Sequence, residues 1–218
     1  MRYHHFRLPW RPALLILLAS PVLFAAYKAK PWTLRARDSY PANLTSERVT
    51  IAVDPLFTDV LAAQVFDKSD IVTRGIMPLA VVVFNDNDFP IALDGDAIQL
   101  IHGDEHSHTI PVNEVVHRIF QKSGKSWIPQ PLPRMPTVDR GNQDALDDFD
   151  HKSMSKKIIE GHGKGGGFLY LHIPAKDITG YLSDSQLYIP EIRRQDTGAE
   201  MIYFEIDLKP ALPAIPTK

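Results

Sequence analysis

The chain has 218 residues, of which 44% are hydrophobic and 23% charged, so it can bury the core of one folded domain. Its 24 basic and 26 acidic residues give a formal net charge of −2, and no basic surface for nucleic acid is expected. The absence of cysteine excludes disulfides, thiolate catalysis, cysteine-bound metal and a lipid anchor on cysteine.

Residues 1–30 have the pattern of a signal peptide or membrane anchor. Arg2, Arg7 and Arg11 precede an apolar run over residues 12–26, and a basic region followed by about fifteen apolar residues is typical of export signals. Whether the segment is cleaved stays open, because the run lacks a clear pair of small residues at cleavage spacing. We expect the rest of the chain to lie in the cell envelope, on the periplasmic or other extracytoplasmic side, either secreted or anchored to the membrane.

The segment that follows, residues 31–48, contains two prolines and shows no hydrophobic period, which predicts a linker. The folded domain is predicted over residues 49–209. Its first strand, residues 49–53, places apolar side chains at alternate positions. A short helix capped by Thr58 or Asp59 is expected next.

The most apolar part of the domain is residues 76–102. Leu79 to Phe84 are apolar at every position, which predicts a strand that is covered on both faces. Two turns rich in Asp, Asn and Gly, at residues 85–88 and 94–96, divide the stretch. The pattern predicts three consecutive strands of one antiparallel sheet, beginning with a core hairpin.

The middle of the chain alternates short elements with a proline-rich segment. Residues 109–112 are predicted as a strand, and Asn113 is expected to cap a helix over residues 114–122. Four prolines in residues 123–143 predict an extended surface excursion. A further short helix is expected over residues 144–151.

The C-terminal part reads as strands joined by turns. A glycine-rich turn is predicted at residues 161–167, and residues 210–218, with three prolines, are expected to form a flexible tail. Residues 201–208 show the cleanest alternation, with Ile202, Phe204, Ile206 and Leu208 expected inward. The four strands predicted here cover residues 158–159, 168–173, 186–189 and 201–208.

These elements predict a mainly β fold, an immunoglobulin-like antiparallel β-sandwich with short helical insertions, behind an N-terminal hydrophobic signal or anchor helix. Over most of residues 38–208 the chain resembles uncharacterised bacterial envelope proteins with a predicted immunoglobulin-like domain. The resemblance implies a fold and a location, and it brings no catalytic residue. It rests on Asp38-Ser-Tyr-Pro41, Val49-Thr-Ile-Ala52, Arg74-Gly-Ile-Met-Pro-Leu79, Val83-Phe-Asn-Asp-Asn-Asp88, Gly167-Phe-Leu-Tyr170 and Ile202-Tyr-Phe-Glu-Ile206.

A histidine-rich hairpin is the sharpest candidate for chemistry. If the strands before and after residues 103–107 pair, His102 and His108 lie opposite each other with Cβ atoms about 5 Å apart. With His106, they could hold Zn or another transition metal. The alternative is a polar hairpin tip with solvated histidines, and a shift of one residue in register would place His102 and His108 on opposite faces.

Other motifs favour structural roles. The aspartates of the two turns at residues 85–88 and 94–96 are too far apart to share a calcium ion. Lys164 is followed by glycine, whereas a phosphate-binding loop requires Ser or Thr there. No Gly-x-Ser-x-Gly motif is present.

The sequence therefore predicts a non-enzymatic, exported or membrane-tethered binding or structural accessory protein of the bacterial cell envelope. Its expected partners are the membrane, through the N-terminal segment, and another envelope protein. The alternative is a metal-binding module that uses the hairpin from His102 to His108, and no other cofactor is expected.

Overall fold

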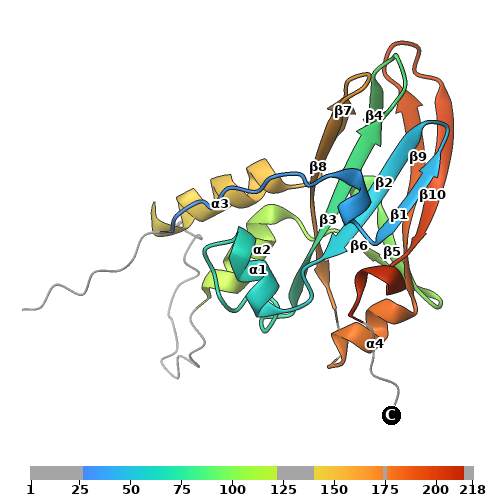
Figure 1. The fold of residues 1–218 in the computed structure, drawn as a ribbon. Coiled ribbons are helices and arrows are strands. Elements are labelled where there is room, and N and C mark those ends of the chain that lie inside the picture. The colour runs from blue at the N-terminus through green and yellow to red at the C-terminus, as the bar shows by residue number, and fades with distance from the viewer. Residues whose placement is uncertain (1–26, 122–139, 174–175, 214–218) are drawn as a thin grey trace, which may run out of the picture.

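The computed structural model describes residues 27–121, 140–173 and 176–213, and it shows a mainly β protein with two antiparallel sheets (Figure 1). The four-stranded sheet has the order β1 (Ala42–Ser46), β2 (Val49–Pro55), β3 (Ile76–Asn85) and β8 (Lys164–His172). In the six-stranded sheet β10 (Glu200–Asp207) pairs with β9, and the remaining order is β6 (Glu105–His108), β5 (Gln99–His102), β9 (Ser185–Arg194), β4 (Ile91–Leu93) and β7 (Lys157–Ile159).

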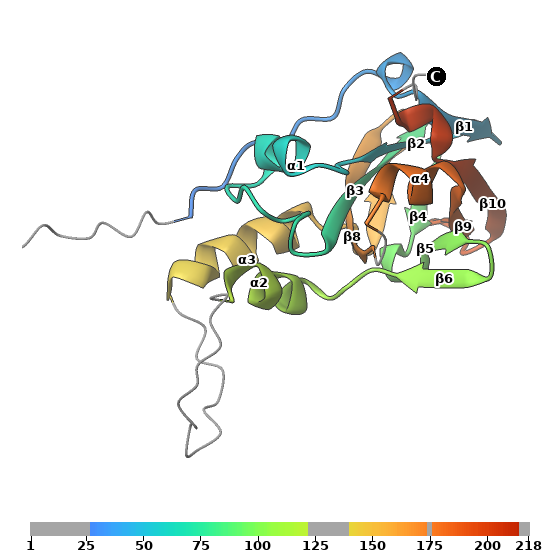
Figure 2. The same cartoon turned by 90° about the horizontal axis from the view of Figure 1, so that it is seen from below.

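Short helices complete the fold. In Figures 1 and 2, α1, α2 and α3 lie together beside the sheets, on the side away from β9 and β10. The α-helices are α1 (Asp59–Val65), α2 (Val112–Phe120), α3 (Arg140–Lys152) and α4 (Ile178–Ser183), and the 3-10 turns are η1 (Arg37–Ser39), η2 (Gly95–Ala97) and η3 (Lys209–Ala211).

The sandwich core lies between the two sheets and consists of apolar side chains. The predicted alternation of the last strand is confirmed, since Phe204, Ile206 and Leu208 are buried whereas Glu205 and Asp207 are exposed. Hydrophobic side chains from both sheets meet here because each sheet has one face that must leave water.

A helical core lies on the other face of the four-stranded sheet. Along β8, Leu169 and Leu171 face the sandwich core, while Phe168 and Tyr170 face α1, α2 and α3. Every residue of β3 is buried, because the helices cover Ile76 and Ala80 on this face whereas Tyr40, Trp32 and Leu34 cover Val82 and Phe84. The expected strand with two covered faces is therefore present, and its second face is covered by the helices together with the segment before β1.

The strand pairing differs from the predicted core hairpin. β3 pairs with β2 and β8, whereas β4 pairs with β7 and β9, so the two consecutive strands belong to different sheets. The turn between them instead ties the sheets together. The buried Asn85 side chain donates from Nδ2 to the carbonyl oxygens of Phe89 and Ile159, at 2.8 and 3.2 Å. A strand pattern fixes which residues are buried, and it does not fix the partner strand.

The turn predicted at residues 161–167 is confirmed at Gly161 and His162, and the glycines that follow lie in a strand. Gly165, Gly166 and Gly167 belong to β8 and pair with β3. A Cβ atom on Gly166 would lie 2.6 Å from the carbonyl oxygen of Val81. These glycines permit close backbone approach within a sheet, which is an alternative to turn formation.

Element boundaries shift in three other places. The predicted linker, residues 31–48, contains β1, which pairs with β2. Residues 109–111 form no strand, and α2 begins at Val112 behind Pro111, so Asn113 is not its cap. The sequence did not predict α4, whose N-cap is Asp177. β1 shows no alternation of buried and exposed residues, and α4 is too short for a hydrophobic period to identify it.

Several predicted features lie outside the described residues. These are the N-terminal apolar run, residues 123–139 of the proline-rich excursion and residues 214–218 of the tail, whereas residues 140–143 of the predicted excursion belong to α3. Within the described parts of the chain, no helix has both the length and the apolarity that a membrane span requires. The immunoglobulin-like assignment and the signal or anchor helix stay predictions.

Candidate functional site

The histidine hairpin forms with a different register from the expected one. Gly103 and Asp104 are the turn between β5 and β6, so His102 faces Glu105 and His108 faces Gln99. Opposed residues in an antiparallel pair share a face, and neighbouring residues on a strand alternate faces. His102 therefore lies on one face of the hairpin, and His106 and His108 lie on the other.

The three histidines have separate surroundings. The His102 ring stacks on Tyr181 with centroids 4.0 Å apart, and its Nδ1 lies 3.1 Å from Ser185 Oγ. His106 Nδ1 lies 2.8 Å from Gln99 Oε1, and His108 is exposed. Across the described residues, no group of three His, Cys, Asp or Glu side chains is placed to hold a metal ion. The metal-binding alternative gains no support from this arrangement.

Ser185 and His102 lie as close together as a catalytic serine and its base, but the directions of their hydrogen bonds do not suit catalysis. Ser185 is buried, and its hydroxyl donates to the carbonyl oxygen of Tyr181 at 2.7 Å. His102 Nδ1 is then the donor to Ser185 Oγ, which is the reverse of the arrangement that activates a serine. This contact adds to the pairing of β5 with β9, and the stack on Tyr181 fastens the hairpin to α4.

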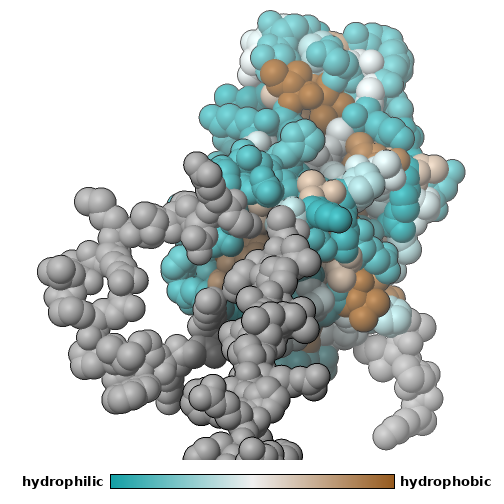
Figure 3. Space-filling model, turned by 90° about the vertical axis from the view of Figure 1, so that its left-hand side faces the viewer, coloured by the Kyte–Doolittle hydropathy of each residue, from teal (hydrophilic) through white to brown (hydrophobic). Residues whose placement is uncertain are grey.

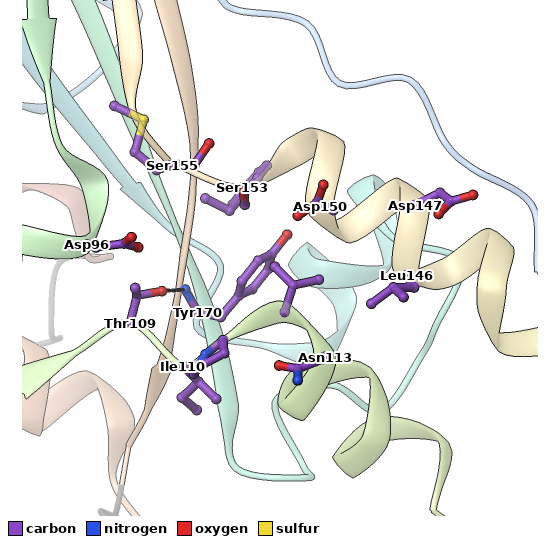
Figure 4. Close-up of a pocket in the computed structure, with 14 residues that line it drawn as sticks. Asp96, Thr109, Ile110, Asn113, Leu146, Asp147, Asp150, Ser153, Ser155 and Tyr170 are labelled. Carbon is purple, nitrogen blue, oxygen red and sulfur yellow. Dashed lines mark hydrogen bonds between the residues drawn. The ribbon is translucent and has the colours of Figure 1, made fainter. Parts of the chain in front are cut away.

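A cleft of about 420 Å³ lies between the sheets and the pair of helices α2 and α3 (Figure 4). Its apolar wall includes Ile110, Leu146, Met154, Phe168 and Tyr170. Its charged groups are three exposed carboxylates, Asp96 from η2 on one side and Asp147 and Asp150 from α3 on the other.

Two glycines bring the sides of the cleft together. A Cβ atom on Gly95 would overlap the carbonyl oxygen of Met154, and one on Gly167 would lie 2.5 Å from the carbonyl oxygen of Ser153. Because both positions lack a side chain, η2 and β8 approach the segment that leaves α3. The same approach places Asp96 at the cleft.

The floor of the cleft is held together by hydrogen bonds. Tyr170 N donates to Thr109 Oγ1 at 3.1 Å, and Ile110 N donates to the Tyr170 carbonyl at 2.6 Å. The Tyr170 hydroxyl donates to the carbonyl of Phe149 at 2.8 Å, and complete burial raises the pKa of this phenol well above its usual value. Tyr170 therefore acts as a structural donor and is not a proton-transfer group near neutral pH.

The charges of the cleft favour a cationic ligand. None of its described lining residues is Lys, Arg or His, and Asp96, Asp147 and Asp150 form no ion pair with a described residue. Asp147 accepts a hydrogen bond from Gln143 at 2.7 Å. An ammonium or guanidinium group could be paired by the carboxylates while its aliphatic stem lies on the apolar wall.

On the opposite flank of α3, a buried polar network holds the first described residues. Tyr27 donates to Asp148 at 2.6 Å, and Lys152 Nζ lies 2.7 Å from the same carboxylate. Lys152 also donates to the carbonyl of Val65 at 3.0 Å. Burial raises the pKa of Tyr27 and lowers the pKa of Lys152, because both charged forms are poorly solvated there.

Sequence reasoning missed both the cleft and this network. The run of acids at residues 147–150 was visible, but its division between two flanks of α3 was not. Asp148 points to Lys152 four residues later on the same helix, a spacing that could have indicated the pair. Tyr27 and Asp96 are distant in sequence from α3, and only the tertiary structure brings them to it.

Comparisons with known proteins add little. No protein-family model and no curated protein matches the sequence. Among solved structures, the YjhA protein from Bacillus subtilis aligns with a TM-score of 0.37 and 11% identity, over 69% of this chain and 79% of that chain. A protein of Bacillus subtilis subspecies subtilis described as a "putative lipoprotein (ycdA)" aligns with a TM-score of 0.36 and 13% identity, over 77% of this chain and 38% of that chain. Similarity at this level assigns neither a fold family nor a function.

Proposed function

We propose that the protein is a non-enzymatic binding protein of the bacterial cell envelope, tethered to the membrane by its N-terminal apolar segment. Its cleft between the sheets and α2–α3 receives a positively charged group of an envelope partner. The observation that carries this proposal is the cleft itself, with three solvent-facing carboxylates above an apolar wall.

The sequence supports the location. Three arginines followed by the apolar run of residues 12–26 favour export or anchoring. The test is to express the full chain with a C-terminal tag, fractionate the cells and size the protein on a gel. Recovery in the membrane fraction at full length is expected, whereas recovery in the cytosol would contradict the proposal.

The chemistry of the cleft supports a binding role. Ser153 and Ser155 line it, but the described lining residues include no histidine or lysine that could act as their base. Pairing with a cation would instead use side chains that are already oriented by α3 and η2. A ligand held by charge-assisted hydrogen bonds should bind more weakly as ionic strength rises.

A charge-matched experiment tests the cleft. Calorimetric titration with a tetralysine peptide at low salt should show binding that is lost when Asp96, Asp147 and Asp150 are all changed to Asn. The control changes Asp38, Asp104 and Asp144 to Asn, three exposed acids outside the cleft with no described ion pair. Equal affinities of the two triple variants would show that net charge alone attracts the peptide.

A further inference from the structure

The first described residues form a tether segment, residues 27–35, that is fastened along its whole length. Tyr27 is buried and packs against Phe120 and Phe149, with ring centroids 6.2 and 6.3 Å apart. Lys28 N donates to Asp67 at 2.9 Å, and Lys30 Nζ donates to the carbonyl of Ala63 at 2.6 Å.

The later part of the segment is fastened as well. The Trp32 ring lies 4.5 Å from that of Phe168, and Arg35 pairs with Asp54 at 2.7 Å. In Figures 1 and 2 the segment begins at the helical end of the molecule, away from β9 and β10. The folded body is therefore attached from Tyr27 onward, one residue after the apolar run ends.

Because Tyr27 is docked, no flexible linker separates the apolar run from the folded body. Fifteen residues in a helix span about 22 Å, which is less than the roughly 30 Å hydrocarbon core of a bilayer. A run that is too short to span draws its flanking residues toward the interface. The residues that would be drawn in are Tyr27 and its neighbours, and these are docked on the body.

Because Tyr27 docks at the helical end of the body, we infer that this end lies against the lipid bilayer, with β9 and β10 directed away from it. The contacting surface, named the tether face, consists of Lys28, Lys30, Val60, Gln64 and Lys68. This inference rests on the membrane tether of the proposed function and adds the orientation of the body.

The tether face fits contact with lipid headgroups. Val60 is 74% exposed, more than the other exposed large hydrophobic side chains, Leu44, Ile158 and Tyr203. Lys30 and Lys68 pair with Asp67 and Asp70, and Arg74 shares Asp70, so these two acids neutralise part of the basic charge of the region. Figure 3 looks onto the helical side, and its visible surface is mostly hydrophilic with separate small hydrophobic patches. A shallow contact with lipid headgroups follows.

The absence of cysteine makes the orientation measurable with single labels. Gln64→Cys on α1 and Glu205→Cys on β10 replace exposed residues on opposite sides of the molecule. Each full-length variant is labelled with a fluorescent donor and reconstituted into zwitterionic vesicles that carry a headgroup-linked acceptor. Energy transfer from position 64 should exceed transfer from position 205.

Flotation with the vesicles is measured on the same samples. A chain that fails to float would overturn the tether and this inference with it. A chain that floats with equal transfer from the two positions, or with more from position 205, would overturn the orientation alone.

A linker variant tests the cause of the orientation. Ten Gly and Ser residues inserted between Ala26 and Tyr27 add a flexible connection of about 16–19 Å on average. Flotation should persist, and the excess transfer from position 64 should be lost. If transfer from position 64 still exceeded transfer from position 205 in this variant, the short connection before Tyr27 would not be the cause of the orientation.

Discussion

The sandwich core and the helical core are stabilised by different chemistry. The sandwich core is apolar, with side chains from alternate positions of the strands. The helical core combines stacked aromatic rings, such as Phe66 and Phe149 with centroids 4.3 Å apart, with the buried pair of Asp148 and Lys152. The first core requires burial of hydrophobic surface alone, whereas the second also requires every charged group to keep its partner.

The first prediction tests the sandwich core. Phe204→Ala removes a fully buried ring and should lower the free energy of unfolding by about 3–5 kcal/mol. Glu205→Ala, at the exposed neighbouring position, should change it by less than about 0.5 kcal/mol. Urea unfolding of both variants measures the contrast, and equal losses would refute the register of β10.

The second prediction addresses the helical core. Lys152→Ala leaves the Asp148 carboxylate buried without its cation and should cost about 3–5 kcal/mol. A triple variant, Tyr27→Phe with Asp148→Leu and Lys152→Met, removes the whole network and should unfold at nearly the parent urea concentration. If the triple variant were as unstable as Lys152→Ala, the network would be a net source of stability.

The third prediction concerns Tyr27 and pH. Tyr27→Phe should cost about 1.5–3 kcal/mol near neutral pH, because a hydrogen bond to a carboxylate is lost. Burial raises the folded-state pKa of Tyr27, so its contribution is fully present below pH about 10 and is lost at higher pH, where the unfolded tyrosine ionises. From pH 9 to 11 the parent should therefore lose about 1 kcal/mol more stability than Tyr27→Phe. Parallel pH-dependent melts that coincide would contradict this.

The smallest effect separates two histidines that the sequence grouped together. His102→Ala should cost about 1–2 kcal/mol, because it removes the stack on Tyr181 and the contact with Ser185. His106→Ala, on the exposed face, should cost less than about 0.5 kcal/mol. Thermal melts with and without added zinc check both variants, and a zinc-dependent rise that both substitutions abolish would restore the metal-binding hypothesis.

Most of the strands could be predicted because burial imposes a two-residue period on a chain whose sheets each face a core. The two covered faces of β3 were likewise visible in its unbroken apolar run. The strands that pair with β3 and β4 could not be predicted, since the same hydrophobic pattern is compatible with a hairpin and with two strands in separate sheets. The predicted register of the histidine hairpin was wrong for a related reason. The local composition is the same for a turn of two residues as for a turn of five, and the structure has the turn of two.

The candidate cleft could not be predicted, because its parts are brought together by close backbone approach at Gly95 and Gly167. The sequence by itself determined that this is a mainly β protein with a final amphipathic strand and an apolar N-terminal run. The tertiary structure alone decided which flank of α3 each aspartate occupies and where Tyr27 docks. Local periodicity reports whether a side chain is buried, whereas contacts between distant residues depend on how whole elements pack.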